Sequence, residues 1–390
     1  MKKLTLIPLL LLPLFGSDIS YLNSIRQSVG LNKLQLNQDL DNAAQKHANY
    51  LVAHSVNSHY EKRGAKFYAQ TPSKRAIKSG YTSKYIKENI ATDVSSTKKA
   101  IDVLFSAIYH RFVFLDFAVD EIGVGIAKNS HNKVVKNAYV YDLGLSSVAK
   151  MCQQEYLTLE GVYYMQDLCK DSTKYIPKSD YEKAIKDIQS SNPKVVLYPN
   201  KDASGVIPAF FDEKPNPMPG YKVSGYPISV ELNPSYFKDI KIKRFRLYDA
   251  KGMMIRAKLL RASNDPNKKL KDYQFAIIPL QRLDYDTTYK AYFEANTNRG
   301  RVKLKWKFHT LKFDKPTYKI TKQYTQIKTK QDSIILYIKP RNRKDIITKI
   351  KIKGKVKIDF IDANTLQLSK IATKKTTLYV GDEEIHITKE

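Results

Sequence analysis

The sequence predicts an α+β protein, with helices concentrated in the first half of the chain and strands in the second. Apolar residues recur at helical spacing in several segments before residue 190, whereas alternation of period two dominates after residue 195. The chain has 390 residues, enough for about two to three domains of ordinary size. We therefore expect a helix-rich N-terminal domain with a small sheet, a bridging segment and two β modules.

The first 17 residues have the pattern of a secretory signal peptide. Residues 1–3 are Met-Lys-Lys, the stretch from Leu4 to Phe15 is apolar, and Gly16-Ser17 is a pair of small residues. The apolar stretch is shorter than a comfortable membrane span. We therefore expect an exported protein, secreted or periplasmic, whose mature chain has no transmembrane span.

Amphipathic helices are expected to open the N-terminal domain. Apolar residues form one helical stripe between Ile19 and Val29 and a second between Leu40 and Leu51. A shorter helix has signals at both of its ends. These are a capping hydroxyl at Thr71, a proline at position 72 and a glycine at position 80.

Another helix is expected to begin near Thr97 and to continue through Ile108 with an apolar inner face. Two short β-rich runs follow, at residues 121–127 and 138–143. Helices stacked around a small sheet follow from this order of elements.

Four short motifs in this domain carry histidines and carboxylates. They are Ser58-His59-Tyr60-Glu61, Glu88-Asn89-Ile90-Ala91, Tyr109-His110-Arg111 and Glu121-Ile122-Gly123-Val124-Gly125. With the helix before them, they resemble the signature of the CAP superfamily, the fold of cysteine-rich secretory proteins and plant pathogenesis-related proteins, in its bacterial form. The resemblance covers residues 18–146 and implies an α/β/α sandwich.

The resemblance implies an open cleft in which side chains from these motifs converge. Its candidate residues are His59, Glu61, Glu88, His110 and Glu121. The two histidines are candidate ligands for zinc or another divalent metal. Glu88 is a candidate third ligand, a group that orients an imidazole, or a general base. A purely structural role, in which these groups hydrogen-bond to each other and to the backbone, also stays open.

The motifs depart from the family pattern at two places. Lys87 replaces the usual glycine before Glu88, and the second pocket glutamate of many members would fall near Ala107. Without that second carboxylate, proton transfer between paired acids is disfavoured. Glu61 shares a face with His59 on an extended segment, whereas Glu121 opens a strand and is equally an architectural hydrogen-bond acceptor.

The only two cysteines, Cys152 and Cys169, lie in a bridging segment at residues 147–195. Because the signal peptide predicts an oxidising compartment, we expect them to form a disulfide. A helix is expected from Asp180 to Gln189.

Two β modules are expected after this segment. The first, residues 196–311, contains alternating runs such as Ile228–Leu232, and its ending around Trp306 resembles the last strands of bacterial Ig-like modules. The second, residues 312–390, has isoleucine and valine alternating with lysine near residues 350–358. Lysine on an outer sheet face discourages edge-to-edge aggregation.

The chain is strongly basic, with 67 Lys and Arg against 38 Asp and Glu and a formal net charge of +29 at pH 7. In an exported protein such a balance favours lipid head groups or envelope polyanions, with no nucleic acid as partner, although a protein partner and plain solvated lysine faces stay open. We expect a noncatalytic ligand-binding or cell-envelope interaction protein of bacterial type. The alternative is a metal-dependent hydrolase acting on peptide, lipid or cell-wall material.

Overall fold

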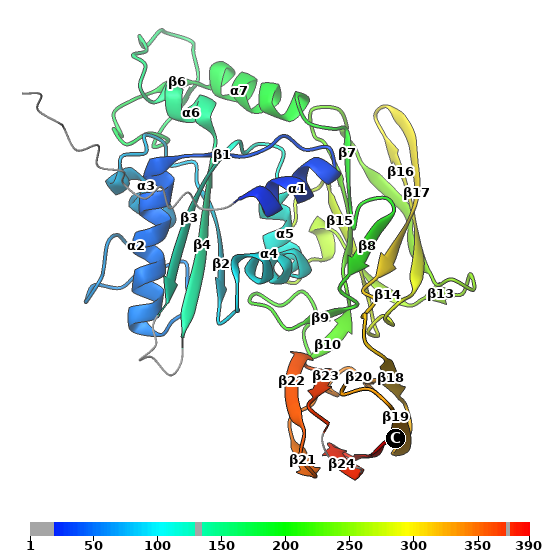
Figure 1. The fold of residues 1–390 in the computed structure, drawn as a ribbon. Helices are drawn as coiled ribbons and strands as arrows, with labels where there is room; N and C mark the ends of the chain where they lie inside the picture. The colour runs from blue at the N-terminus through cyan, green and yellow to red at the C-terminus, as the bar shows by residue number, and fades with distance from the viewer. Residues whose placement is uncertain (1–18, 129–134, 372–374) are drawn as a thin grey trace, which may run out of the picture. The chain divides into compact units, whose positions relative to one another are not determined.

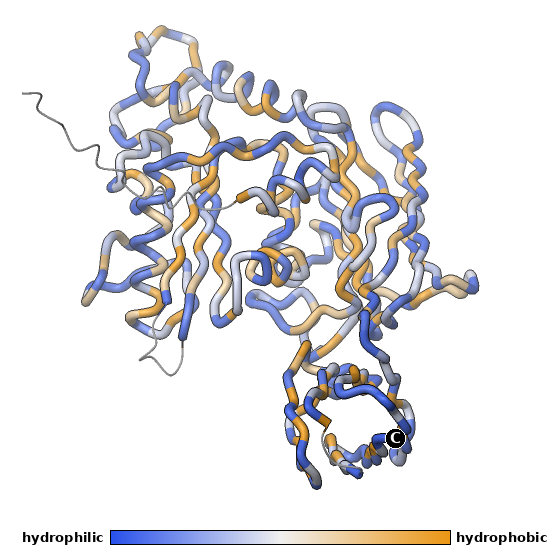
Figure 2. Tube along the Cα trace, in the orientation of Figure 1, coloured by the Kyte–Doolittle hydropathy of each residue, from blue (hydrophilic) through white to orange (hydrophobic). Residues whose placement is uncertain are grey.

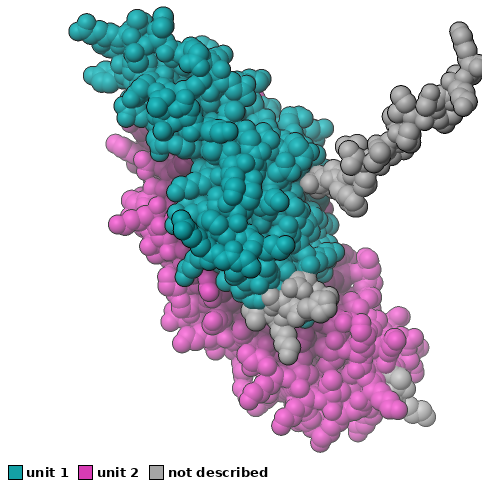
Figure 3. Space-filling view, turned by 90° about the vertical axis from the view of Figure 1, so that its left-hand side faces the viewer, with its two compact units in different colours: residues 1–27, 32–101, 118–184 teal, residues 28–31, 102–117, 185–390 magenta. Residues whose placement is uncertain are grey.

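A computed structural model describes residues 19–128, 135–371 and 375–390. The predicted signal peptide lies outside the described residues. The chain divides into two compact units, which Figure 3 colours teal and magenta. Unit 1 comprises residues up to 27, 32–101 and 118–184, and unit 2 comprises residues 28–31, 102–117 and 185–390. The predicted α+β class is confirmed, whereas the predicted domain boundaries stay predictions.

A four-stranded sheet runs through unit 1 (Figure 1). Its order is β1-β3-β4-β2, with β1 parallel to β3 and the other neighbours antiparallel. The strands are β1 (Gln35–Leu36), β2 (Lys87–Thr92), β3 (Glu121–Lys128) and β4 (Asn137–Gly144). The two β-rich runs predicted from sequence are therefore strands, and they are adjacent in the sheet.

Helix α2 (Gln38–His54) lies along β3, and two glycines permit this close approach (Figure 1). A Cβ atom at Gly123 would stand 2.0 Å from the backbone of Leu40, and one at Gly125 would stand 2.1 Å from the backbone of Ala44. No residue with a side chain fits at that distance. The apolar stripe predicted for this helix is fully buried.

Side chains of α2 also satisfy the backbone of β3 beyond the end of the short strand β1. The Asp41 carboxylate accepts a hydrogen bond from Val124 N at 2.7 Å. The Gln45 amide accepts from Ile126 N at 3.1 Å and donates to Ile126 O at 2.9 Å. These contacts supply partners that a longer neighbouring strand would otherwise provide.

Helix α3 (Pro72–Ser79) has the ends that the sequence predicts. The Thr71 hydroxyl accepts a hydrogen bond from Lys74 N at 3.2 Å, and Gly80 ends the helix with a φ of 116°. Helix α1 (Ser20–Ser28) forms where the first stripe predicts it. Within the described ranges, no helix has the length and hydropathy needed to cross a membrane.

The helix expected from Thr97 through Ile108 is wrong at its end. Helix α4 (Thr97–Ser106) stops before Ala107, whose φ of −83° and ψ of 113° are extended, and helix α5 (Ile108–Phe114) begins anew. The apolar residues that form the predicted inner face are all buried, on both sides of the break. They are Ala100, Ile101, Leu104, Phe105 and Ile108. The break itself has no local proline or glycine that would have revealed it.

Cys152 and Cys169 form the predicted disulfide. The chain after Cys169 pairs with the segment after α3, through Lys170 N to Thr82 O at 2.8 Å and Lys84 N to Leu168 O at 2.7 Å. The bridge therefore ties this stretch to unit 1. The elements around it are α6 (Ser146–Met151), β5 (Tyr164–Met165), β6 (Ile176–Pro177) and α7 (Lys178–Ser190).

In unit 2, two sheets share one hydrophobic core that includes Val230 and Phe275 from one sheet and Phe293 from the other. The first sheet comprises β7 (Val195–Tyr198), β11 (Ile228–Leu232), β14 (Ala257–Leu260) and β15 (Gln274–Pro279). The second comprises β8 (Ala203–Val206), β12 (Lys241–Tyr248), β13 (Met254–Ile255), β16 (Thr288–Thr297) and β17 (Gly300–Thr310). Shorter elements are β9 (Ala209–Phe211), β10 (Val223–Gly225) and the 3₁₀ turn η1 (Ala262–Asn264). Many β folds pack two sheets in this way, so the Ig-like resemblance stays a prediction.

The last stretch of the chain forms a second pair of four-stranded sheets around its own core. One sheet comprises β18 (Thr317–Ile320), β20 (Ser333–Ile338), β22 (Lys357–Asp362) and β23 (Thr365–Ser369). The other comprises β19 (Tyr324–Thr329), β21 (Ile350–Lys353), β24 (Lys375–Val380) and β25 (Glu383–Lys389). Ile350 and Ile358 pack against this core as the alternation predicts, whereas Ile352 is exposed.

The contact between α2 and β3 predicts a large effect of a single methyl group. In Gly125→Ala, the added Cβ collides with the Ala44 backbone, and we expect a loss of about 3 kcal/mol of unfolding free energy, the upper part of the range for overpacking. Urea unfolding of the full chain measures this loss.

Gly161→Ala is the matched control in unit 1. A Cβ there meets no heavy atom within 4 Å, and the residue has a φ of 77°, so only backbone strain of about 1 kcal/mol is expected. Equal losses in the two variants would contradict the packing argument.

Candidate functional site

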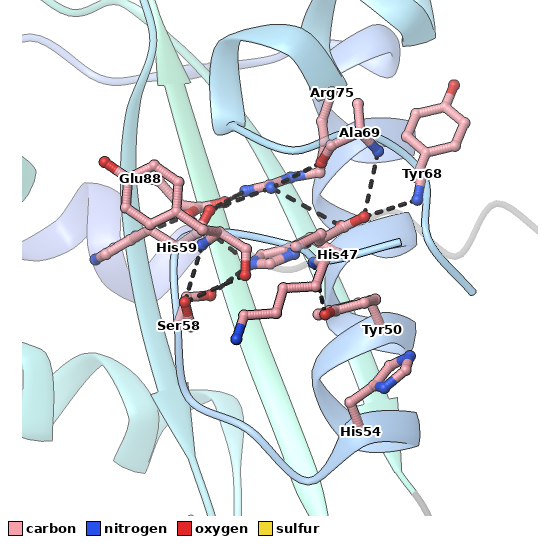
Figure 4. A network of polar contacts seen from close by, with 12 residues as sticks. His47, Tyr50, His54, Ser58, His59, Tyr68, Ala69, Arg75 and Glu88 are labelled. Atoms are coloured by element: carbon pink, nitrogen blue, oxygen red, sulfur yellow. Dashed lines mark hydrogen bonds and ion pairs between the residues drawn. The ribbon is translucent and has the colours of Figure 1, made fainter. Parts of the chain in front are cut away.

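The buried polar cluster of unit 1 brings together side chains from five parts of the fold, and Figure 4 shows His47, His59, Arg75 and Glu88 among them. Its members are His47 on α2, His59 and Glu61 in the loop that follows, Arg75 on α3, Glu88 on β2 and Asp142 on β4. His59 has a side chain that is 43% exposed, and the other five members are buried. Three of the predicted cleft residues, His59, Glu61 and Glu88, are therefore neighbours in one network.

His47 anchors the network from α2, and both of its ring nitrogens face oxygen acceptors. Nδ1 lies 2.9 Å from Glu61 Oε1, and Nε2 lies 2.9 Å from the Ser58 carbonyl oxygen. The second nitrogen therefore donates to the carbonyl, and the first meets a carboxyl group. His47 is therefore a buried histidine that is satisfied at both ring nitrogens and belongs to the core.

Glu61 holds the loop between α2 and α3. Its Oε2 atom accepts hydrogen bonds from Tyr68 N at 2.7 Å and Ala69 N at 3.2 Å, while Oε1 faces His47. The carboxylate thus binds two backbone amides of a segment with no regular secondary structure. Its contacts are those of a residue that shapes a loop.

Arg75 joins the two glutamates and the histidine loop. Its Nη2 atom lies 2.6 Å from Glu88 Oε2, and Nη1 lies 3.8 Å from Glu61 Oε1. Both terminal nitrogens also donate to the His59 carbonyl oxygen at 3.2 Å. Arg75 is fully buried, so its charge depends on these partners.

Glu88 fixes the one exposed member of the cluster. Its Oε1 atom lies 2.7 Å from His59 Nδ1. Burial disfavours the charged carboxylate, but the hydrogen bond from His59 and the charges of Arg75 and His47 outweigh burial and lower the pKa of Glu88. The Nδ1 atom of His59 is thereby held by a buried anion.

Asp142 lies directly across the sheet from Glu88, because these two residues are partners in the β2–β4 register. The Asp142 carboxyl is fully buried, and neither oxygen has a hydrogen-bond donor among the described residues. Burial first, and then the negative charge of Glu88, raise the pKa of Asp142 well above its usual range, although Arg75 opposes the shift. The raised pKa of Asp142 beside the lowered pKa of Glu88 favours a proton on Asp142 rather than on Glu88.

Glu121 is in unit 1 but has other partners. It accepts hydrogen bonds from Asn37 Nδ2 at 3.0 Å and from the Tyr81 hydroxyl at 2.8 Å. Burial and the Glu121 charge raise the pKa of Tyr81, which keeps its hydroxyl protonated as the donor. Because Asn37 caps α2, Glu121 supports the helix start and plays the architectural role that the sequence left open.

His110 lies on α5, which belongs to unit 2. The pairing of His59 with His110 on a metal ion stays a prediction. Across the described parts of the chain, no group of three or more His, Cys, Asp or Glu side chains is arranged to hold a metal ion. The donors of unit 1 alone therefore do not fit a zinc site with three protein ligands.

Arg111, the next residue of the same motif, is fully buried within unit 2. Its guanidinium carbon lies 4.9 Å and 4.8 Å from the ring centres of Tyr198 and Tyr226. Nε donates to Phe105 O at 2.6 Å, and Nη1 donates to Pro227 O at 2.8 Å. Arg111 therefore ties α5 to the neighbouring strands.

Sequence reasoning missed three members of the cluster, His47, Arg75 and Asp142. Asp142 had a signal, because it is a single carboxylate inside the apolar run of β4. Arg75 had none, since one basic residue among the lysines of α3 looks like part of a solvated face.

Residues 19–143 match the family model of the cysteine-rich secretory protein family, CAP. The search of curated proteins gives no match. Among solved structures, the chain is similar to an outer surface protein from Borrelia burgdorferi, with 18% identity, coverage of 32% of this chain and 87% of that one, and a TM-score of 0.28. It is also similar to an extracellular protein containing a SCP domain from Bacillus anthracis str. Ames, with 21% identity, coverage of 32% and 37%, and a TM-score of 0.27.

The buried ion pair predicts strong coupling between Arg75 and Glu88. Arg75→Met leaves the Glu88 carboxylate buried without its partner, and we expect a loss of about 3–5 kcal/mol of unfolding free energy. Adding Glu88→Gln to this variant should recover part of the loss, because no uncompensated charge remains. Urea unfolding of both single variants and the double variant measures the coupling, and additive losses would contradict it.

Asp142 predicts a stability difference that depends on pH. The pKa of Asp142 is raised in the folded protein. At a pH between the unfolded and the folded pKa, the folded protein holds a proton that the unfolded chain releases. The contribution of Asp142 to the stability of the wild type therefore falls as the pH rises. Asp142→Asn does not titrate at this position. We therefore expect this variant to gain stability relative to wild type as the pH rises from the ordinary aspartate pKa, about 4, through the measured range.

Urea midpoints at about pH 4 and about pH 8, the ends of the measured range, give this gain. Glu160→Gln removes an exposed carboxyl of unit 1 and serves as control, with no comparable trend. A difference between Asp142→Asn and wild type that is constant with pH would show that Asp142 is ionised in the folded protein.

Proposed function

Since residues 19–143 form a CAP domain, we propose that this chain is an exported, noncatalytic protein that binds a ligand or a partner in the cell envelope. The disulfide between Cys152 and Cys169 is compatible with secretion. The strongly basic composition favours an anionic environment outside the cell.

The buried polar cluster is the observation that carries the noncatalytic part of the proposal. A general acid or base must reach the substrate directly or through one water. His47, Glu61, Arg75 and Glu88 instead bind one another and the backbone of the loop, and each is buried. The polar groups of the cluster hold the loop in place. This role suits a protein that binds a ligand better than one that catalyses a reaction.

A metal-dependent hydrolase remains the second candidate, and one contact favours it. Glu88 holds Nδ1 of His59 at 2.7 Å, and the side chain of His59 is 43% exposed. This arrangement directs Nε2 away from the carboxylate, as in histidines that bind a metal or act as a base. His110 would be the second histidine of such a site.

Incubation of the full-length protein with wall fragments, lipids and peptides tests the choice between these functions. The binding proposal predicts no product above a protein-free control. Turnover that is lost in His59→Gln would overturn it in favour of the hydrolase, whereas turnover that survives this substitution would point to a contaminant.

Zinc titration tests the metal site separately. If His59 and His110 share an ion, His59→Ala and His110→Ala each abolish zinc binding measured by calorimetry, and His309→Ala in β17 does not. Because two histidines make a weak site, the expected affinity is modest. The same affinity in all four proteins would remove the metal site from the proposal.

A further inference from the structure

A basic groove lies on the second sheet of the first β module in unit 2, on the face opposite its hydrophobic core. Residues of β16 and β17 alternate between core and surface, and Figure 2 shows the corresponding alternation in hydropathy. The groove has a volume of about 660 Å³. Its cationic residues are Lys201, Arg244, Arg246, Lys290, Lys305 and Lys307.

Little negative charge balances these cations. Asp202 is the one acid that lines the groove, and it lies 3.6 Å from Lys307 Nζ. Among the described residues the other five cations form no ion pair, although the register sets Glu294 opposite Arg244. Glu294, the nearest acid on β16, accepts a hydrogen bond from the Tyr292 hydroxyl at 2.6 Å and forms an ion pair with Arg301.

The strand register sets like charges directly opposite one another. Lys290 on β16 is the partner of Lys307 on β17. Like charges in directly opposed positions destabilise a sheet. Asp202 offsets the charge of Lys307 in this pair but forms no ion pair with Lys290, so an anion bound beside Lys290 would relieve the remaining repulsion.

Two tyrosines interrupt the cations. In the register, Tyr292 stands between Arg246 and Lys305, and Tyr248 stands beside Lys290. Both rings are half-buried, and Lys305 Nζ lies 5.8 Å from the centre of the Tyr292 ring. An aromatic ring with polar groups around it can pack against the apolar face of a sugar while neighbouring cations bind its acidic substituents.

We propose that the basic groove binds an acidic polysaccharide through its repeated carboxylate or sulfate groups, an inference that rests on the proposed function because it requires an exported protein. Five of the six cations come from three adjacent strands, β12, β16 and β17, so a ligand with repeated acidic groups can contact several of them at once. Single-stranded nucleic acid also combines cations with aromatic rings, and an anionic bilayer also attracts a basic surface, so both are outcomes of the test.

The test measures binding of polygalacturonate oligosaccharides to the full-length protein by calorimetry, with neutral dextran as the uncharged comparison. Lys290→Gln/Lys305→Gln should weaken binding roughly tenfold, the sum expected of two partly exposed ion pairs. Lys351→Gln/Lys353→Gln removes the same charge from exposed positions on β21 and should leave the affinity within about twofold. Equal weakening in both double variants would overturn the proposal in favour of diffuse attraction.

Two further probes separate the partner classes. Single-stranded DNA or phosphatidylglycerol vesicles that bind more tightly than the oligosaccharide, with the same dependence on Lys290 and Lys305, would overturn the assignment to polysaccharide. Tyr292→Ala should lower oligosaccharide affinity, because it removes the ring. The folding of each variant is checked by its thermal midpoint, which Lys290→Gln should not lower since it removes a like-charge pair.

Failure of this inference and failure of the proposed function have different signatures. Release of shorter products from polygalacturonate would contradict the noncatalytic function and leave groove binding intact. Retention of the protein inside the cell on fractionation would remove the biological setting without changing the affinity in solution. Equal weakening of binding in the groove variant and in the β21 variant would contradict the groove proposal and leave the proposed function unaffected.

Discussion

The site in unit 1 depends on the ion pair between Arg75 and Glu88. This pair joins α3 to β2, and through the His59 carbonyl and imidazole it also fixes the loop after α2. Neither charge has water around it, so each is stable only while the other is present. Burial raises the pKa of Asp142 first, and the negative charge of Glu88 raises it further while Arg75 opposes the shift, so both members of the pair act on this carboxyl. A change at one member therefore alters the protonation, the loop and the exposed histidine together.

Features encoded locally were predictable from the sequence. The ends of α3 depend on residues 71, 72 and 80, and each acts through contacts within its own helix. The apolar stripe of α2 and the alternation of β16 and β17 are likewise periodic in the chain itself. The CAP motifs added His59, Glu61 and Glu88 as neighbours, which no local rule supplies, since 27 residues separate Glu61 from Glu88.

What the sequence could not supply depends on register and on packing between elements. The raised pKa of Asp142 depends on its burial and on the β2–β4 register, which sets it opposite Glu88. Ala107 ends α4 without a local breaker. The basic groove has the same origin: Lys290 and Lys307 are 17 residues apart, and only the hairpin register makes them opposed.

The net charge of +29 therefore includes three kinds of basic residue. Buried arginines such as Arg75 and Arg111 are matched by a carboxylate, by carbonyl oxygens or by aromatic faces, and they serve stability. Most exposed lysines are solvated, and their contribution is screened by salt over roughly 10 Å. The groove cations differ from both, because a fixed sheet holds six of them beside a single lining carboxylate, Asp202, and sets Lys290 directly opposite Lys307. Where a fold holds like charges together against their repulsion, an anionic ligand is the simplest physical reason for keeping them.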